Sequence, residues 1–106
     1  DVRESAEFTG SLGHILGARL IPLAELQSRL DELDRARPVV TVCRSGTRSA
    51  QAAVLLGKAG FTQVANLSGG MLRWRAAGHA VEGGSALAPR DRAARRPDGG
   101  VRSAVP

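Results

Sequence analysis

The single cysteine of this 106-residue chain, Cys43, lies where a strand is expected to end and a helix to begin. Residues 39–42 form a β-branched run that is typical of a buried parallel strand. Ser49 opens an Ala/Leu-rich stretch that predicts a helix to about Gly60. The loop between them is small, polar and basic: Arg44, Ser45, Gly46, Thr47 and Arg48. Such a loop can turn several backbone N–H groups toward one point in front of the helix dipole, so the pattern predicts an anion site at the cysteine.

A cysteine in such a site is expected to ionise more readily than an ordinary thiol. The usual pKa of about 8.5 falls to roughly 3.5 to 7.5 at helix N-termini or beside cations. A shift of about two units takes about 2.7 kcal/mol, and a helix terminus supplies at most about 2 kcal/mol. We therefore expect the loop N–H groups and Arg44 or Arg48 to contribute as well. The alternative is an inert, buried cysteine that packs as a small hydrophobe.

Four segments around and beside this loop resemble, in the same order, the single-domain rhodaneses, a family of sulfurtransferases. They read DVRESAEF, GHILGARLIP, CRSGTRS and LSGGMLRW, and the resemblance covers residues 1 to about 82. It implies that Cys43 accepts a sulfane sulfur and becomes a persulfide, and that Arg48 closes the loop. It also implies that His14 is structural. The implied substrate-binding residues are Arg44, Ser45, Gly46, Thr47, Arg48 and Ser49.

The fold class implied by the resemblance is α/β, with an open, mainly parallel sheet and helices on both faces. Residues 1–3 match only the end of the family's first strand, so the N-terminal strand is expected to be truncated in this chain. Short strands are expected at 19–21 and 64–67. The leucine spacing predicts a core-facing helix over 23–36. By resemblance, the glycine-rich turn at 68–70 should approach the cysteine loop closely.

Composition divides the chain into a domain at 1–84, which the resemblance implies is rhodanese-like with an incomplete start, and a tail rich in Arg, Ala, Gly and Pro at 85–106. The domain carries ten Lys/Arg against eight Asp/Glu, whereas the tail carries five Arg against two Asp, so most of the net charge of +5 lies in the tail. The tail has too few large apolar residues to offset the entropy of ordering, and it is expected to be disordered.

Several function classes are disfavoured by composition. Aromatic residues make up 3% of the chain, too few for a base-stacking nucleic-acid surface. No apolar run approaches 18 residues, which argues against a membrane span. One cysteine and two separated histidines do not make a metal site, and no cofactor is expected. A single cysteine allows no internal disulfide, which suits the cytoplasm.

Three functions remain open. The first is a sulfurtransferase that takes sulfur from a small anionic donor such as thiosulfate, or from a persulfide, and passes it to a thiol or cyanide. A dithiol protein such as a thioredoxin would also be a suitable acceptor. The second is a cysteine-thiolate phosphatase or arsenate reductase, which the spacing disfavours: Arg48 lies five positions after Cys43, whereas such phosphatases have six. The third is a sulfur-relay or regulatory module that docks a protein partner.

Overall fold

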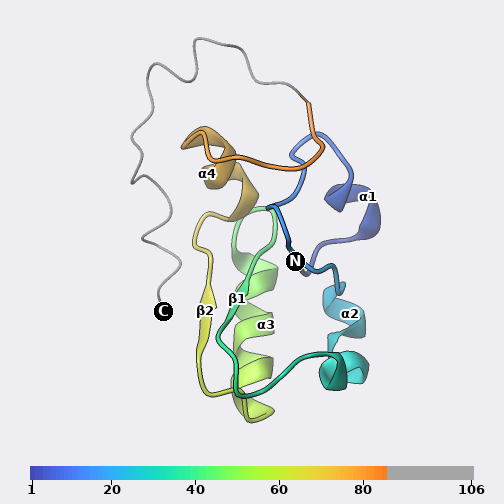
Figure 1. The fold of residues 1–106 in the computed structure, drawn as a ribbon, viewed down its shortest axis with the longest axis vertical. Helices are drawn as coiled ribbons and strands as arrows, with labels where there is room; N and C mark the ends of the chain where they lie inside the picture. The colour runs from blue at the N-terminus through green and yellow to red at the C-terminus, as the bar shows by residue number, and fades with distance from the viewer. Residues whose placement is uncertain (86–106) are drawn as a thin grey trace.

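The computed structural model describes residues 1–85 as a chain of short helices around a parallel pair of strands (Figure 1). The elements are α1 (Ser5–Phe8), α2 (Leu23–Leu26), the 3₁₀ helix η1 (Gln27–Glu32), β1 (Val39–Thr41), α3 (Thr47–Lys58), β2 (Val64–Asn66) and α4 (Gly70–Ala76). The strands pair in register from Val39 opposite Val64 to Thr41 opposite Asn66. This confirms the predicted open, parallel α/β architecture. The predicted disordered tail lies outside the described residues, except for Ser85.

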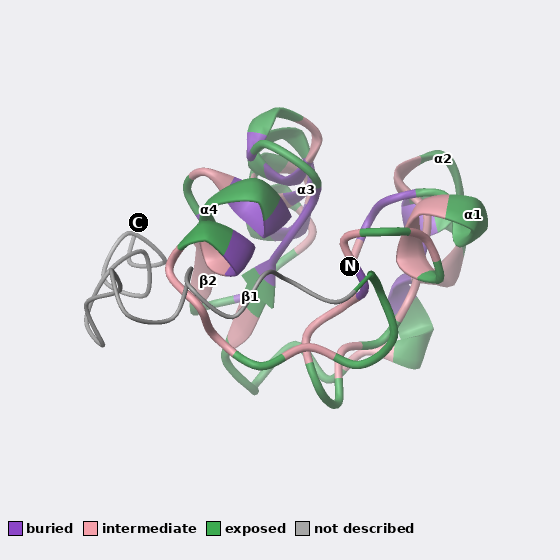
Figure 2. Ribbon diagram, turned by 90° about the horizontal axis from the view of Figure 1, so that it is seen from above, coloured by how far each residue is buried: buried purple, intermediate pink, exposed green. Residues whose placement is uncertain are grey.

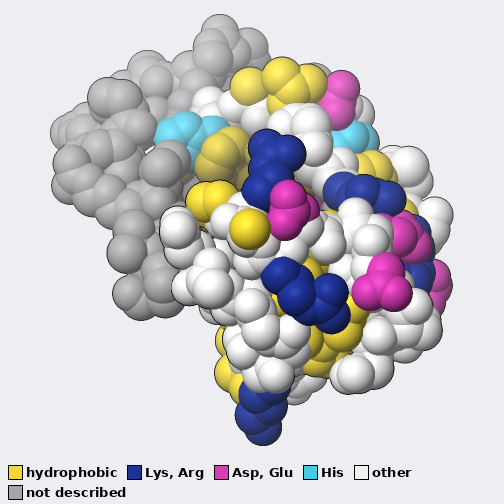
Figure 3. Space-filling view, turned by 60° about the horizontal axis from the view of Figure 1, so that its bottom comes forward, with side chains coloured by type: hydrophobic (Ala, Val, Ile, Leu, Met, Phe, Trp, Pro, Cys, Tyr) yellow, Lys and Arg dark blue, Asp and Glu magenta, His cyan; other side chains and the backbone are white. Residues whose placement is uncertain are grey.

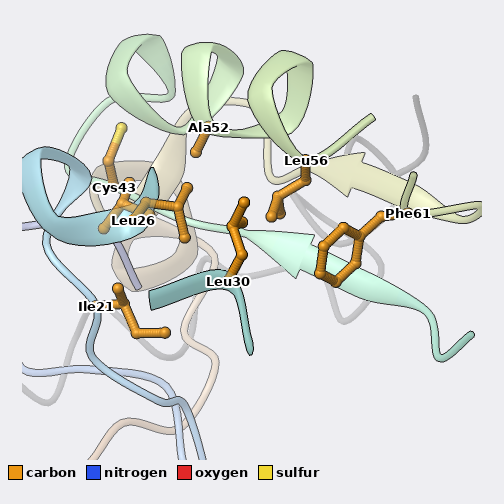
Figure 4. Packing of buried hydrophobic residues seen from close by; sticks show 8 residues of the cluster. Ile21, Leu26, Leu30, Cys43, Ala52, Leu56 and Phe61 are labelled. Carbon is orange, nitrogen blue, oxygen red and sulfur yellow. The ribbon is translucent and has the colours of Figure 1, made fainter. Parts of the chain in front are cut away.

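The core lies between α3, β1 and the α2–η1 segment (Figure 4). Leu26 and Leu30 are 2% and 8% exposed, so the leucine stripe faces the interior as predicted. On α3, Ala52 and Leu56 are 0% and 1% exposed and face the same cluster. Figure 2 shows that the outer sides of α3 and α4 are exposed while their inner sides are buried. Cys43 belongs to this cluster, so the reactive candidate is anchored in the core.

Two predicted elements differ in type from the structure, and two differ in bounds: α3 begins at Thr47 rather than Ser49, and β2 ends at Asn66 rather than at 67. The helix expected over 23–36 is instead one α-helical turn followed by the 3₁₀ helix η1, with Arg29 at φ −119° and ψ 18°. Leu30 is buried within η1, and Leu33, the extended residue that follows η1, packs half-buried against the same cluster. Residues 19–21 form no strand. Their backbone bonds to Asp1, whose amino group donates to the carbonyl of Arg19 at 2.8 Å and whose carbonyl accepts from Ile21, and so short a contact makes no ladder.

Residues 1–2 lie between the end of β1 and the segment before α2. The N–H of Val2 donates to the carbonyl of Val42 at 2.9 Å, and the N–H of Ile21 donates to the carbonyl of Asp1 at 2.9 Å. A cavity of about 280 Å³ lies beside these residues, lined mainly by apolar side chains of 15–21 and 39–42. Cys43 is not among its lining residues, so this cavity is separate from the thiol.

The described residues carry neither a membrane span nor a metal cluster. No helix within 1–85 is long and apolar enough to cross a bilayer. In the same part of the chain no three His, Cys, Asp or Glu residues are placed to hold a metal ion. On the face seen in Figure 3, basic and acidic side chains are interspersed. That face therefore presents no patch of a single charge sign.

Candidate active site

The thiol of Cys43 is enclosed by hydrogen-bond donors from the loop and the first turn of α3. The residue is 1% exposed, and its side chain points from the end of β1 toward α3 (Figure 4). The N–H of Gly46 lies 3.0 Å from Sγ, and the N–H and hydroxyl of Ser49 lie 3.3 and 3.2 Å from it. All of these groups can donate, which is the arrangement that an anionic sulfur requires.

Two opposing influences act on the pKa of Cys43. Burial raises it, because the charged thiolate loses hydration. Hydrogen bonds from the Ser49 hydroxyl and from the N–H groups of Ser49, Gly46 and Ser45 lower it. The hydrogen bonds outweigh burial, so the pKa of the thiol lies below its usual value. Neutral donors give the largest lowering, and the charge of Arg48 also interacts with the sulfur, since Cys43 is among the groups that raise the pKa of Arg48.

Glycines at two junctions allow the loop to take this shape. Gly46 has φ 107° and precedes α3, a backbone conformation that favours glycine. Gly70, at φ 55°, lies against the loop carbonyls, and a Cβ there would be 2.5 Å from the carbonyl oxygen of Arg44. The N–H groups of Met71 and Leu72 donate to the carbonyls of Cys43 and Arg44 at 2.9 and 3.0 Å. The glycine-rich turn therefore supports the cysteine loop, as the resemblance implied.

Asn66, at the end of β2, is a site residue that the sequence did not reveal. Its Oδ1 accepts a hydrogen bond from the Ser49 hydroxyl at 2.5 Å, and its Nδ2 donates to the carbonyl of Gly46 at 3.2 Å. The one available signal was its position: the carboxyl ends of neighbouring parallel strands meet at the same edge of a sheet. Asn66 therefore contacts Gly46 and Ser49, two of the residues that donate to the sulfur.

Arg48 joins the loop to α1. Its Nη1 and Nη2 donate to the two carboxylate oxygens of Glu7 at 2.7 and 2.8 Å. The hydrogen bonds from Arg48 lower the pKa of Glu7 to about 2. Arg48 is thus paired in charge with Glu7. We call this two-bond ion pair, which fixes the loop against α1, the clamp. Glu7 was missed because it lies 41 residues from its partner.

The other predicted binding residues surround the buried thiol. Arg44, Ser45 and Thr47 are exposed, whereas Gly46 and Ser49 are buried. Within residues 1–85, Arg44 forms no ion pair. His14 lies elsewhere: its Nδ1 is 2.9 Å from the carbonyl of Phe8, and its Nε2 is 3.1 Å from a carboxylate oxygen of Glu82. It connects the end of α1 to Glu82.

The clamp between Glu7 and Arg48 predicts a change in acid stability. A carboxylate whose folded pKa is depressed stabilises the fold above its unfolded pKa, and this contribution is lost as pH falls from about 4.5 toward 2. Glu7→Gln keeps the shape but cannot titrate, so its free energy of unfolding should fall less over that window. Urea unfolding at a series of pH values measures this. Asp31→Asn, which alters a fully exposed carboxylate, should follow the unmodified protein. Identical pH profiles for Glu7→Gln and the unmodified protein would contradict the prediction.

Comparison with known proteins finds similar sequences and structures that cover most of the chain. Residues 1–77 match the Rhodanese-like domain family. The chain is 49% identical over 74 residues to the uncharacterized protein YqhL of Bacillus subtilis, covering 70% of this chain and 57% of that protein. It is 36% identical over 76 residues to the thiosulfate sulfurtransferase GlpE of Ectopseudomonas mendocina, covering 72% of this chain and 68% of that protein. The crystal structure of a rhodanese-related protein from Thermoplasma volcanium superposes with a TM-score of 0.72 at 32% identity, covering 77% and 79% of the two chains.

Proposed function

Because the chain belongs to the rhodanese-like domain family, we propose that it is a sulfurtransferase that carries sulfane sulfur on Cys43. The observation that carries this proposal is the convergence of the Gly46 and Ser49 donors on one buried sulfur. The loop N–H groups that stabilise a thiolate can also stabilise the negative charge of a persulfide formed on Cys43. A thiosulfate sulfurtransferase among the relatives supports the same chemistry.

The proposed reaction has two displacements and needs no cofactor. The Cys43 thiolate attacks the outer sulfur of thiosulfate, a new S–S bond forms, and the bond from that sulfur to the sulfonate breaks. Sulfite leaves with the electron pair, and Cys43 holds a persulfide anion. A thiolate or cyanide then attacks the terminal sulfur and releases the Cys43 thiolate. Thiocyanate is the product when cyanide is the acceptor.

The exposed loop residues have a separate role in this proposal. Arg44, with no carboxylate partner in residues 1–85, attracts the small anionic donor, and Ser45 and Thr47 border its approach. Arg48, paired with Glu7, holds the loop in shape. The acceptors proposed are a thiol, cyanide, or a dithiol protein such as a thioredoxin. We propose the cytoplasm as the location, since its thiols stay reduced.

Mass spectrometry after incubation with thiosulfate tests the proposal. The protein should gain about 32 Da, the mass of one sulfur atom, and a dithiol should reverse the gain. A phosphate ester such as p-nitrophenyl phosphate should not be hydrolysed, which distinguishes sulfur transfer from phosphatase chemistry. An unmodified Cys43 after treatment with thiosulfate, or hydrolysis of the ester, would overturn the proposal.

A further inference from the structure

The hydroxyl of Ser49 lies between two acceptors that compete for its one proton. Its Oγ is 3.2 Å from Sγ of Cys43 and 2.5 Å from Oδ1 of Asn66. A serine hydroxyl has a single O–H donor, so it can satisfy only one of these neighbours at a time. Ser49 is fully buried at 0% exposure and Asn66 is half-buried, so the two acceptors rather than water are the neighbours of this hydroxyl. The direction of this one bond therefore depends on the state of the sulfur.

The amide of Asn66 is held in one orientation by Gly46. Nδ2 donates to the Gly46 carbonyl at 3.2 Å, and the same carbonyl accepts the N–H of Ala50 at 3.1 Å. Reversing the amide would place Oδ1 against the Gly46 oxygen, and two acceptors would then face each other. The carboxamide oxygen is thus kept toward Ser49, where it always competes with the sulfur for the hydroxyl proton.

The two protonation states of Cys43 differ in how well they fit this arrangement. A thiol can donate S–H to Ser49 Oγ while the hydroxyl donates to Asn66 Oδ1, so every group is paired. A thiolate can only accept, so the hydroxyl must turn to Sγ, and Oδ1 then loses its donor. A persulfide has a neutral inner sulfur, which is a weak acceptor, and the hydroxyl can return to Asn66. Asn66 therefore favours the thiol and the persulfide over the free thiolate.

We propose that Asn66 is a positioning residue that controls the rotation of the Ser49 hydroxyl and so limits how firmly the loop holds the free sulfur anion. This inference rests on the proposed function, because it makes the loaded state of Cys43 easier to reach. It requires no proton transfer between Ser49 and Asn66: the hydroxyl rotates about its C–O bond, and the proton of Cys43 leaves to solvent.

Titration of the thiolate by its ultraviolet absorbance tests this coupling without any sulfur donor. Asn66→Ala removes the competing acceptor, so the thiolate should form at lower pH, with an acid dissociation constant about two- to tenfold larger. In a Ser49→Ala background the same replacement should change nothing, because there is no hydroxyl to release. Asn66→Leu, which keeps the shape of asparagine without its polar atoms, should behave like Asn66→Ala. Gln63→Ala, at an exposed residue just before β2, is the control and should titrate normally.

The outcomes separate this inference from the proposed function. One outcome is that the acid dissociation constant shifts equally on Asn66→Ala whether residue 49 is serine or alanine. That result would mean that Asn66 acts through the Gly46 loop, and it would overturn the inference. So would an unchanged constant, or a shift to higher pH, in Asn66→Ala and Asn66→Leu. The expected coupling without any gain of sulfur mass would instead count against sulfur transfer alone. Thermal unfolding of each variant verifies that the titration reports folded protein.

Discussion

Replacing Cys43 by serine is expected to reduce sulfur transfer to background while the protein stays folded. Serine preserves a hydrogen-bonding group next to Gly46 and Ser49, but its hydroxyl does not ionise near neutral pH and is no nucleophile toward sulfane sulfur. Thiocyanate formation from thiosulfate and cyanide measures the transfer, and circular dichroism measures the fold. The mass gain of about 32 Da should also disappear, since the persulfide has no sulfur on which to form.

Cys43→Ala provides the matched control for this first prediction. It removes the same nucleophile without adding a buried hydroxyl, so it should be equally inactive. Any difference in stability between the two variants then reports the effect of the buried serine hydroxyl. The chain has no other cysteine, so sulfur cannot be carried at a second thiol. Transfer that persists in both variants would contradict a mechanism through Cys43.

Replacing Gly70 by alanine is expected to lower both stability and sulfur transfer. The residue has φ 55°, where a side chain costs about 1 to 2 kcal/mol. Its Cβ would also overlap the carbonyl oxygens of Cys43 and Arg44, and such crowding typically costs about 1 to 3 kcal/mol more. Relief requires α4 to move away from the loop, which breaks the hydrogen bonds from Met71 and Leu72. Urea unfolding and thiocyanate formation measure the two effects.

Two other glycines distinguish backbone strain from overlap with the loop as the cause of the loss in Gly70→Ala. Gly17 has φ 80°, but a Cβ added there would meet nothing within 4 Å, so Gly17→Ala should show the backbone strain alone. Gly57 is inside α3 with equally open space and no positive φ, so Gly57→Ala should stabilise the protein by about 0.5 to 1 kcal/mol. Neither change touches the cysteine loop, and transfer should be unaffected. Equal losses for Gly17→Ala and Gly70→Ala would show that the close approach to the loop is unimportant.

Local sequence was enough to predict the parts of the site that are continuous in the chain. The β-branched run, the loop and the Ala-rich helix lie within 39–60, and their propensities agree with one another. The donors of Gly46 and Ser49 follow from that order, because a helix that starts after the loop turns its free N–H groups toward the strand end. The leucines of α2 and η1 were likewise placed correctly on the core side, since a spacing of three and four residues puts them on one face.

The tertiary structure alone decided which distant residues complete the site. Asn66 reaches Ser49 because β2 pairs with β1 in one register, with Thr41 opposite Asn66. Glu7 reaches Arg48 because α1 packs beside the loop, and Gly70 reaches the Cys43 carbonyl because α4 starts there. Composition and periodicity report which face of an element is buried, but they do not report which polar side chains meet across 17 or 41 residues. Those contacts depend on strand register and helix placement, which the packing of the whole core determines.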